Sequence, residues 1–251
     1  MTPENALDTK KWRLNNLYRI VDKDGNSIPF NLNSVQAQVL EIQHRRKIIL
    51  KARQLGMSTF SVIDLLDDAL FTPNLSCGIV SYSLEHAQHI FKKIIGHAID
   101  TFFDPLKSYI GVVARSAREI TFVNGSSIRV DTTLRGGTHQ NILVSEFGKT
   151  CARSPQKAEE VVTGTLQAVG QNGSITIEST GEGSDGYFVD MVLSSALHKN
   201  INLTPLDYYL CFYAWYEEPQ YRLQGKVEYD VRLTDYFTKL EGELGITLDQ
   251  Q

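Results

Sequence analysis

The chain has 251 residues, of which 42% are hydrophobic, and it carries a formal net charge of −4 with a sequence pI near 5.9. This length and apolar content suit one sizeable α/β domain with an appendage. The slight excess of acid excludes a protein coated with positive charge for tight, static binding of DNA.

In chain order, residues 1–30 are polar and irregular and predict an N-terminal arm or a small subdomain, with a turn or hairpin tip at Asp22–Asn26. Hydrophobic periodicity then predicts alternating helices and strands across a core of residues 31–215. The expected helices cover 34–44, 60–70, 84–103, 155–168 and 186–197, and the expected strands cover 46–50, 76–81, 141–146, 173–179 and 208–215. Asn124-Gly125 predicts a hairpin between 119–123 and 127–131. This alternation predicts an α/β fold, with a mostly parallel sheet covered by helices on both faces.

The sequence contains no run of eighteen apolar residues and does not begin with a signal peptide, which predicts a soluble intracellular protein. Cys77, Cys151 and Cys211 are isolated and odd in number, so neither a disulfide framework nor a zinc site is indicated.

The segment Lys51–Thr59, with the sequence KARQLGMST, lies between the strand at 46–50 and the helix at 60–70. Strand, loop and helix in this order form the context of a phosphate-binding loop. In its usual form, GxxxxGK[ST], backbone amides at a helix N-terminus hold phosphates, a lysine neutralises their charge and a hydroxyl holds Mg²⁺. An ordinary strand-to-helix turn with a tight glycine is the alternative for this segment taken alone.

The loop departs from the usual form at the lysine. Gly56 and Ser58 fit the pattern, but Met57 stands in the lysine position and Lys51 in the position of the first glycine. The charge of bound phosphates still requires a cation, and both Lys51 and Arg53 lie at the start of the loop, where a long side chain can fold back over it. The residues leave open which of the two has the main role.

Two further strands end in polar residues. One ends at Glu146, where a carboxylate would be placed to activate water. The preceding position, normally an aspartate that supports Mg²⁺, is Ser145, so metal binding would depend on Ser58, the nucleotide and water. The other strand ends at Ser179 and Thr180 in a glycine-rich turn. Either strand alone is also compatible with a buried strand that ends at solvent.

Together these segments resemble the ATPase half of the large terminase subunit, the motor that packages DNA into the capsids of tailed phages and herpesviruses. That family has a deviant Walker A of the form K-x-R-Q-x-G-x-S-T, a Walker B often written SEF or DEA, and a Ser/Thr-rich coupling motif. The corresponding segments here are 51–59, 142–147 and 177–183, with two further matches at Leu134-Arg-Gly-Gly137 and Asn33-Ser-Val-Gln36. The resemblance covers about residues 28–225.

The resemblance implies a P-loop fold of the ASCE type that binds ATP and Mg²⁺, and it assigns roles by position. Ser58 would ligate Mg²⁺, with Glu146 acting through water. Glu146 would also orient or deprotonate the attacking water, and Arg135 would act in trans on the ATP of a neighbouring subunit as an arginine finger. Gln36 would hydrogen-bond the adenine, and the hydroxyls of the coupling motif would sense the γ-phosphate. The full nucleotide-binding set is Gln36, Lys51, Arg53, Gln54, Gly56, Met57, Ser58, Thr59, Ser179 and Thr180.

Some of these assignments have alternatives. Gln38 competes with Gln36 for the adenine, and Arg135 could instead pair with a nearby acid. Thr59 is either a second hydroxyl on the nucleotide or part of the helix cap. Candidate DNA contacts are the basic clusters His44–Lys47, Lys92–Lys93 and Arg115 with Arg118.

The resemblance further implies double-stranded DNA, the portal protein of the procapsid and the small terminase subunit as partners, and no membrane. The chain would self-associate into a ring on the portal, expected to be a pentamer, and would be a monomer in isolation. The expected location is the cytoplasm of the infected bacterial host, outside the mature virion. Residues 216–251 resemble a lid or linker subdomain. No counterpart of the family's RNase H-like nuclease domain follows, so we expect a shortened terminase.

Two other functions remain open from the sequence. A different nucleic-acid-stimulated P-loop ATPase, such as a helicase, is disfavoured by the lack of clear helicase motifs and of a second motor domain. A catalytically inert nucleotide-binding or structural module is favoured by Met57 and Ser145. The presence of Glu146 together with Lys51, Arg53 and Arg135 argues against it, because an inert scaffold does not need that combination.

Overall fold

A computed structural model describes residues 7–134, 137–217 and 231–246. The chain divides into two units, Met1–Phe212 and Tyr213–Gln251. Arg135, the arginine expected to act in trans, lies outside the described residues. In the smaller unit, the described elements include α11 (Val231–Leu244), which falls within the residues expected to form a lid or linker.

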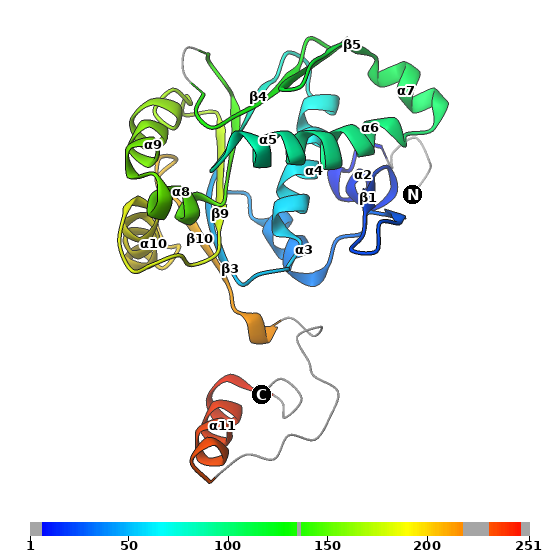
Figure 1. Cartoon of the computed structure of the whole chain (residues 1–251). Coiled ribbons are helices and arrows are strands. Elements are labelled where there is room, and N and C mark those ends of the chain that lie inside the picture. Colours follow the sequence, from blue (N-terminus) through cyan, green and yellow to red (C-terminus); the bar gives the residue numbers. More distant parts are fainter. Residues whose placement is uncertain (1–6, 135–136, 218–230, 247–251) are drawn as a thin grey trace. The chain divides into compact units, whose positions relative to one another are not determined.

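The larger unit is built on an eight-stranded sheet with the strand order β10-β3-β9-β8-β4-β7-β6-β5 (Figure 1). The strands are β3 (Arg46–Lys51), β4 (Ser76–Ser81), β5 (Val112–Arg115), β6 (Glu119–Phe122), β7 (Ser127–Asp131), β8 (Asn141–Ser145), β9 (Ser174–Ser179) and β10 (Tyr209–Tyr213). The β3-β9, β9-β8, β8-β4 and β4-β7 pairs are parallel, whereas β5, β6 and β7 pair antiparallel. The predicted mostly parallel sheet is confirmed, and so is the hairpin at Asn124-Gly125.

Helices cover both faces of this sheet. Figure 1 shows α8, α9 and α10 on one face, and α4 and α5 on the other. Among the described residues, the helices of the larger unit are α2 (Lys10–Asn16), α3 (Ser34–Glu41), α4 (Met57–Phe71), α5 (Leu84–Ile90), α6 (His97–Asp100), α7 (Asp104–Ile110), α8 (Phe147–Arg153), α9 (Pro155–Glu160) and α10 (Tyr187–His198). Two π-helical segments, Phe91–Gly96 and Val161–Thr165, extend α5 and α9. The expected long helix at 84–103 therefore exists as α5, a π-helical stretch and α6.

The central strands are buried on both faces because each face is covered by helices. One core cluster joins strand residues such as Ile48, Val144 and Ile177 to Phe147 of α8 and Phe188 of α10, all of them at most 2% exposed. This packing fixes the positions of the strand ends, where the candidate site lies.

The first 30 residues are more ordered than the sequence suggests. Residues 10–16 form α2, so the expectation of irregular structure is wrong there. The predicted turn at Asp22–Asn26 is confirmed as the tip of a two-stranded hairpin formed by β1 (Arg19–Val21) and β2 (Ser27–Pro29). Local sequence failed to predict α2 because the residues KKWRLNN show little helical periodicity.

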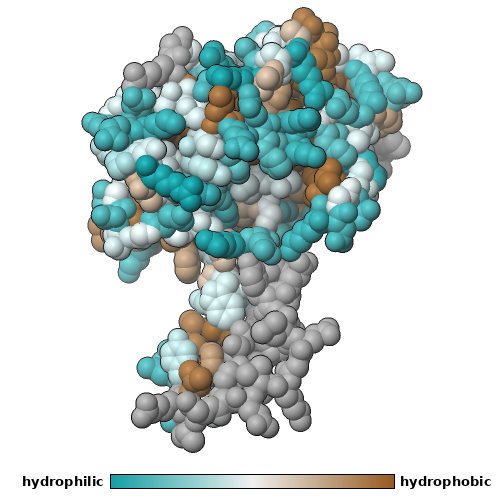
Figure 2. Space-filling view, in the orientation of Figure 1, coloured by the Kyte–Doolittle hydropathy of each residue, from teal (hydrophilic) through white to brown (hydrophobic). Residues whose placement is uncertain are grey.

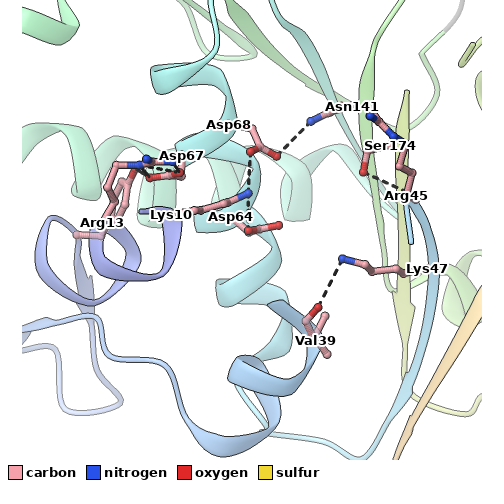
Figure 3. Close-up of polar contacts among 11 residues, drawn as sticks. Lys10, Arg13, Val39, Arg45, Lys47, Asp64, Asp67, Asp68, Asn141 and Ser174 are labelled. Atoms are coloured by element: carbon pink, nitrogen blue, oxygen red, sulfur yellow. Dashed lines mark hydrogen bonds and ion pairs between the residues drawn. The ribbon is translucent and has the colours of Figure 1, made fainter. Parts of the chain in front are cut away.

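Charged contacts fasten α2 to α4 (Figure 3). The carboxylate of Asp67 is fully buried and accepts hydrogen bonds from the Arg13 guanidinium at 2.7 Å and from the Tyr18 hydroxyl at 2.7 Å. Beside this pair, the Lys10 ammonium lies 2.7 Å from a carboxylate oxygen of each of two α4 residues, Asp64 and Asp68. The arm is therefore held against the helix that begins at the phosphate-binding loop.

The surface of the larger unit that Figure 2 displays is mainly hydrophilic, with small separate apolar patches. None of the described helices is long and apolar enough to cross a membrane.

Candidate nucleotide-binding site

Three neighbouring parallel strands deliver the candidate residues to one edge of the sheet. In the register of β3 and β9, Leu50 lies beside Ser179, and in that of β8 and β9, Ser145 lies beside Glu178. Because parallel strands end at the same edge, the residues after each strand converge there. Strand β9 lies between β3 and β8, the strands that precede the phosphate-binding loop and Glu146.

The loop after β3 turns sharply into α4. Gln54 and Gly56 have left-handed backbones, with φ of 61° and 67°. Glycine suits this left-handed backbone, and a Cβ atom on Gly56 would also lie only 2.8 Å from the side-chain nitrogen Nε2 of Gln36, which would have to shift. The 15-residue helix α4 begins directly after this turn, so its N-terminus lies at the loop. Free amides and the positive end of the helix dipole make this a favourable place for phosphate groups.

A cavity of about 510 Å³ opens over this loop. It is lined by Lys51, Arg53, Gln54, Leu55, Gly56, Met57, Ser58, Thr59, Tyr82, His86, Glu146, Lys149, Arg153, Thr180 and Glu182. Nine of the predicted site residues are among these, and Gln36 and Ser179 are not. The volume falls within the range of small-molecule sites in proteins.

Lys51 is held between two carboxylates at the base of the cavity. Its ammonium nitrogen lies 3.1 Å from Glu178 Oε2 and 3.4 Å from Glu146 Oε1, and the residue is 7% exposed. Burial lowers the pKa of Lys51, but the negative charges of Glu178 and Glu146 outweigh this effect and raise it. Lys51 is therefore a buried cation at neutral pH, whereas Arg53 lies at the exposed part of the loop.

Glu146 follows β8 in a strained conformation. It has a φ of 55° and forms the N-cap position of α8, and its side chain is 21% exposed. A left-handed backbone at a residue other than glycine costs about 1–3 kcal/mol, and such strain is typical of functional sites. The next turn is held by Ser179, whose hydroxyl oxygen accepts a hydrogen bond from the Gly148 amide at 3.0 Å. This contact joins the end of β9 to the segment that carries Glu146.

Two predicted nucleotide contacts are directed into the protein. The side chain of Gln36 donates from its amide nitrogen to the Gly56 carbonyl at 3.1 Å and accepts from the Asn33 amide at 3.1 Å. Ser179 is fully buried, while its neighbour Thr180 lines the cavity. In this structure, Gln36 supports the loop and Ser179 supports α8, and their direct contacts with nucleotide remain predictions.

No family model and no curated protein matches the sequence. Among solved structures, the chain is similar to the large terminase ATPase domain of Thermus phage P74-26, with a TM-score of 0.56, 14% identity, and coverage of 86% of this chain and 89% of that one. The chain has the fold of a phage large-terminase ATPase domain. At this identity, the similarity establishes the fold alone.

A second terminase has the same fold. The large terminase of a thermophilic bacteriophage matches with a TM-score of 0.51 and 12% identity over 82% of this chain and 50% of that one. The structure of that terminase in complex with ADP matches with a TM-score of 0.51 and 12% identity, over 83% of this chain and 50% of that one. The present chain thus spans about half the length of this terminase.

The residues of the site suit a magnesium nucleotide. Ser58 is the second residue of α4, is partly buried and lines the cavity, so its hydroxyl is placed to meet a cation on bound phosphates. Among the described residues, no group of three or more His, Cys, Asp or Glu side chains is suited to hold a metal without further ligands. Mg²⁺ in nucleotide sites is commonly held by one or two protein oxygens together with phosphate oxygens and water, so it does not need such a group.

Sequence reasoning missed several polar residues of the site. Lys149 lies with its ammonium 4.0 Å from the centre of the Tyr82 ring, and His86 contacts the Ser81 hydroxyl at 2.6 Å. Lys149 and Arg153 are four positions apart in the sequence, a spacing that would have placed both on one side of a helix had α8 been predicted. Glu178 was missed because a glutamate in a strand is usually exposed, whereas β9 is a central strand of a sheet covered on both faces and Glu178 is buried.

Proposed function

We propose that this chain binds ATP at Lys51–Thr59 and hydrolyses it as the motor domain of a viral large terminase. The observation that carries this proposal is the meeting of Lys51 from β3 and Glu146 from β8, 3.4 Å apart, at the base of a cavity that α4 faces with its N-terminus. A cation for the phosphates and a side chain that orients the attacking water are recurring parts of P-loop enzymes.

Phosphate binding would rest on the loop and on α4. The amides after Gly56 would donate hydrogen bonds to phosphate oxygens, and Lys51 and Arg53 would neutralise their charge. Ser58 would hold Mg²⁺, which when bound neutralises charge on the phosphate oxygens during transfer. Thr59 lies one residue further along α4 and would supply a second hydroxyl.

Hydrolysis would depend on Glu146. Its carboxylate would accept a hydrogen bond from the attacking water, orienting it and taking its proton as the bond from water to the γ-phosphorus forms and the bond from that phosphorus to the bridging oxygen breaks, which releases ADP. Thr180 lines the same cavity and would respond to loss of the γ-phosphate. Ser179 would carry that response to α8 through its contact with Gly148. Arg135 would complete the site of a neighbouring subunit, as arginine fingers do in other P-loop enzymes.

In this proposal, the cycle moves double-stranded DNA into a procapsid. The chain would work as a ring on the portal protein, together with a small terminase subunit, in the cytoplasm of the infected host. The support is the shared fold with terminase ATPase domains together with the motif set of this sequence. DNA contacts would be local, since the net charge of −4 gives no general attraction to DNA.

The test is steady-state ATP hydrolysis by the wild type and by Glu146→Gln over a series of protein concentrations, with nucleotide binding measured in parallel. Glu159→Gln, an exposed carboxylate on α9 outside the cavity lining, is the matched control. We expect turnover that rises faster than linearly with concentration, is retained by the control and is lost in Glu146→Gln. Binding without hydrolysis in the wild type would favour an inert module, and lack of binding would exclude a nucleotide site.

A further inference from the structure

Glu178 is a buried carboxylate that the proposed mechanism does not use. It lies near the end of β9 and has no exposed surface. Its Oε1 accepts a hydrogen bond from the Ser145 hydroxyl at 2.6 Å, and its Oε2 lies 3.1 Å from the ammonium of Lys51. A charge buried in a strand is costly unless it is paired, so this arrangement calls for an explanation.

Glu178 lies beside the position on the neighbouring strand where the Walker B motif usually has an acidic residue and this chain does not. A P-loop ATPase of this type normally carries two acids at the end of the Walker B strand, and the first of them supports the metal. Here that residue is Ser145, and only Glu146 is acidic. In the parallel register Ser145 lies directly beside Glu178. The longer side chain of Glu178 thus brings a carboxylate to the tip of the Ser145 side chain, next to where the carboxylate of an aspartate at 145 would lie.

We propose that Glu178 supplies, from β9, the second carboxylate that the Walker B strand lacks at Ser145. It acts as a positioning residue that holds Lys51 at the loop and presents a carboxylate oxygen to the metal side of the site. This inference rests on the proposed nucleotide-binding function.

The geometry assigns different tasks to the two carboxylates that contact Lys51. Glu178 is fully buried and also bonded to Ser145, so its pairing with Lys51 is fixed by the sheet. Glu146 is partly exposed and its contact with Lys51 is longer, so it is the carboxylate that can turn towards water. Apart from its ion pair with Lys51, Glu178 Oε2 has no hydrogen-bond partner among the described residues, so one lone pair of this buried oxygen is unused.

The test moves the charge from one strand to the other. Glu178→Gln removes the carboxylate with little change of volume, and the double variant Glu178→Gln with Ser145→Asp returns it from β8. Glu159→Gln is the control for a carboxylate outside the site. For each protein, the affinity for ADP is measured with and without Mg²⁺, followed by the urea midpoint and the rate of ATP hydrolysis.

We expect Glu178→Gln to reduce the Mg²⁺-dependent gain in ADP affinity by roughly tenfold, the scale of one charge-assisted contact, and the double variant to restore most of it. A structural role alone would lower the urea midpoint without changing the effect of Mg²⁺. The inference is overturned if Glu178→Gln keeps the full effect of Mg²⁺, or if a folded double variant fails to recover it.

Two further comparisons keep the test decisive. If Glu178→Gln does not fold, Glu178→Asp, which keeps the charge, takes its place beside the double variant. A Mg²⁺ effect in the double variant at least equal to that of Glu178→Asp would support the inference, and a folded double variant with a smaller effect than Glu178→Asp would overturn it. A wild type that binds no nucleotide refutes the proposed function itself. A wild type that binds and hydrolyses ATP, beside an unaffected Glu178→Gln, refutes only the role of Glu178.

Discussion

Replacing Lys51 with alanine tests whether the displaced lysine is the phosphate cation. Lys51 is 7% exposed and contacts Glu178 and Glu146 at 3.1 and 3.4 Å. A hydrogen bond to a charged group contributes about 1.5–3 kcal/mol. Each 1.4 kcal/mol, roughly, changes affinity tenfold, so we expect Lys51→Ala to weaken nucleotide binding by roughly 10- to 100-fold. The variant also leaves buried Glu178 without its partner, which should cost about 3–5 kcal/mol of folding stability.

Met57→Ala is the matched comparison, because Met57 occupies the position where the usual loop carries its lysine. Met57 is 1% exposed at the start of α4, and its loss from the core should cost about 2–5 kcal/mol of stability. Its side chain carries no charge to offer a phosphate, so nucleotide affinity should be unchanged. Both variants are therefore expected to lose stability, and only Lys51→Ala is expected to lose affinity.

Calorimetric titration with ADP and Mg²⁺, at a temperature where circular dichroism shows each variant folded, measures the affinities. Urea unfolding without nucleotide measures the stabilities. Equal losses of affinity in the two variants would refute the assignment of the charge to Lys51. Full affinity in Lys51→Ala would transfer the role to Arg53, the other cation of the loop.

Three other predictions follow from named contacts. Glu146→Gln should bind ATP as tightly as the wild type while turnover falls by about 10²–10⁴-fold, the usual contribution of a general base, and a single-turnover assay would expose retained hydrolysis. Asp67→Asn breaks the buried pair with Arg13 and should lower the free energy of unfolding in urea by about 3–5 kcal/mol, whereas Asp24→Asn on the exposed turn should change it by less than about 0.5 kcal/mol. Burial lowers the pKa of His86 below its usual 6.5, so its contribution to stability is present above that pH and is lost as the pH falls below it. The urea midpoint of the wild type should therefore fall more between pH 7 and about pH 5 than that of His86→Gln, and parallel curves would contradict this.

The sequence predicted the parts of the fold that have strong local signals. Apolar runs marked the central strands, and Asn124-Gly125 marked the hairpin, because a two-residue turn of this kind matches the twist of paired strands. The helix α8 was missed. Its sequence, FGKTCAR, contains glycine, threonine and cysteine, which are weak helix formers, and the helix forms because Phe147 and Cys151 pack into the core. Tertiary contacts of this kind have no local signature.

Residues of the candidate site could be predicted only where they lie in the same short segment as the strand or helix that positions them. Lys51, Gly56 and Glu146 were found because each stands at a fixed distance from a predicted strand or helix. Glu178 and the contact of Gln36 with Gly56 depend on which elements are neighbours in space. Strand order is set by the packing of the whole sheet, and a single sequence does not contain it in any short segment.

The two departures from the usual motifs have one geometric explanation. In our proposals, the positive charge comes from Lys51 at the end of β3 instead of the first residue of α4, and the second negative charge comes from β9 instead of β8. Because β3, β9 and β8 are adjacent and parallel, their ends share one edge, and a charged group can change strands while its position in space hardly changes. Phosphate chemistry requires a charge at a given position around the phosphates, but that charge can come from any strand that ends nearby. A P-loop that looks degenerate by position can therefore keep a full set of charges, and the relevant comparison between such proteins is between strand edges and not between motif positions.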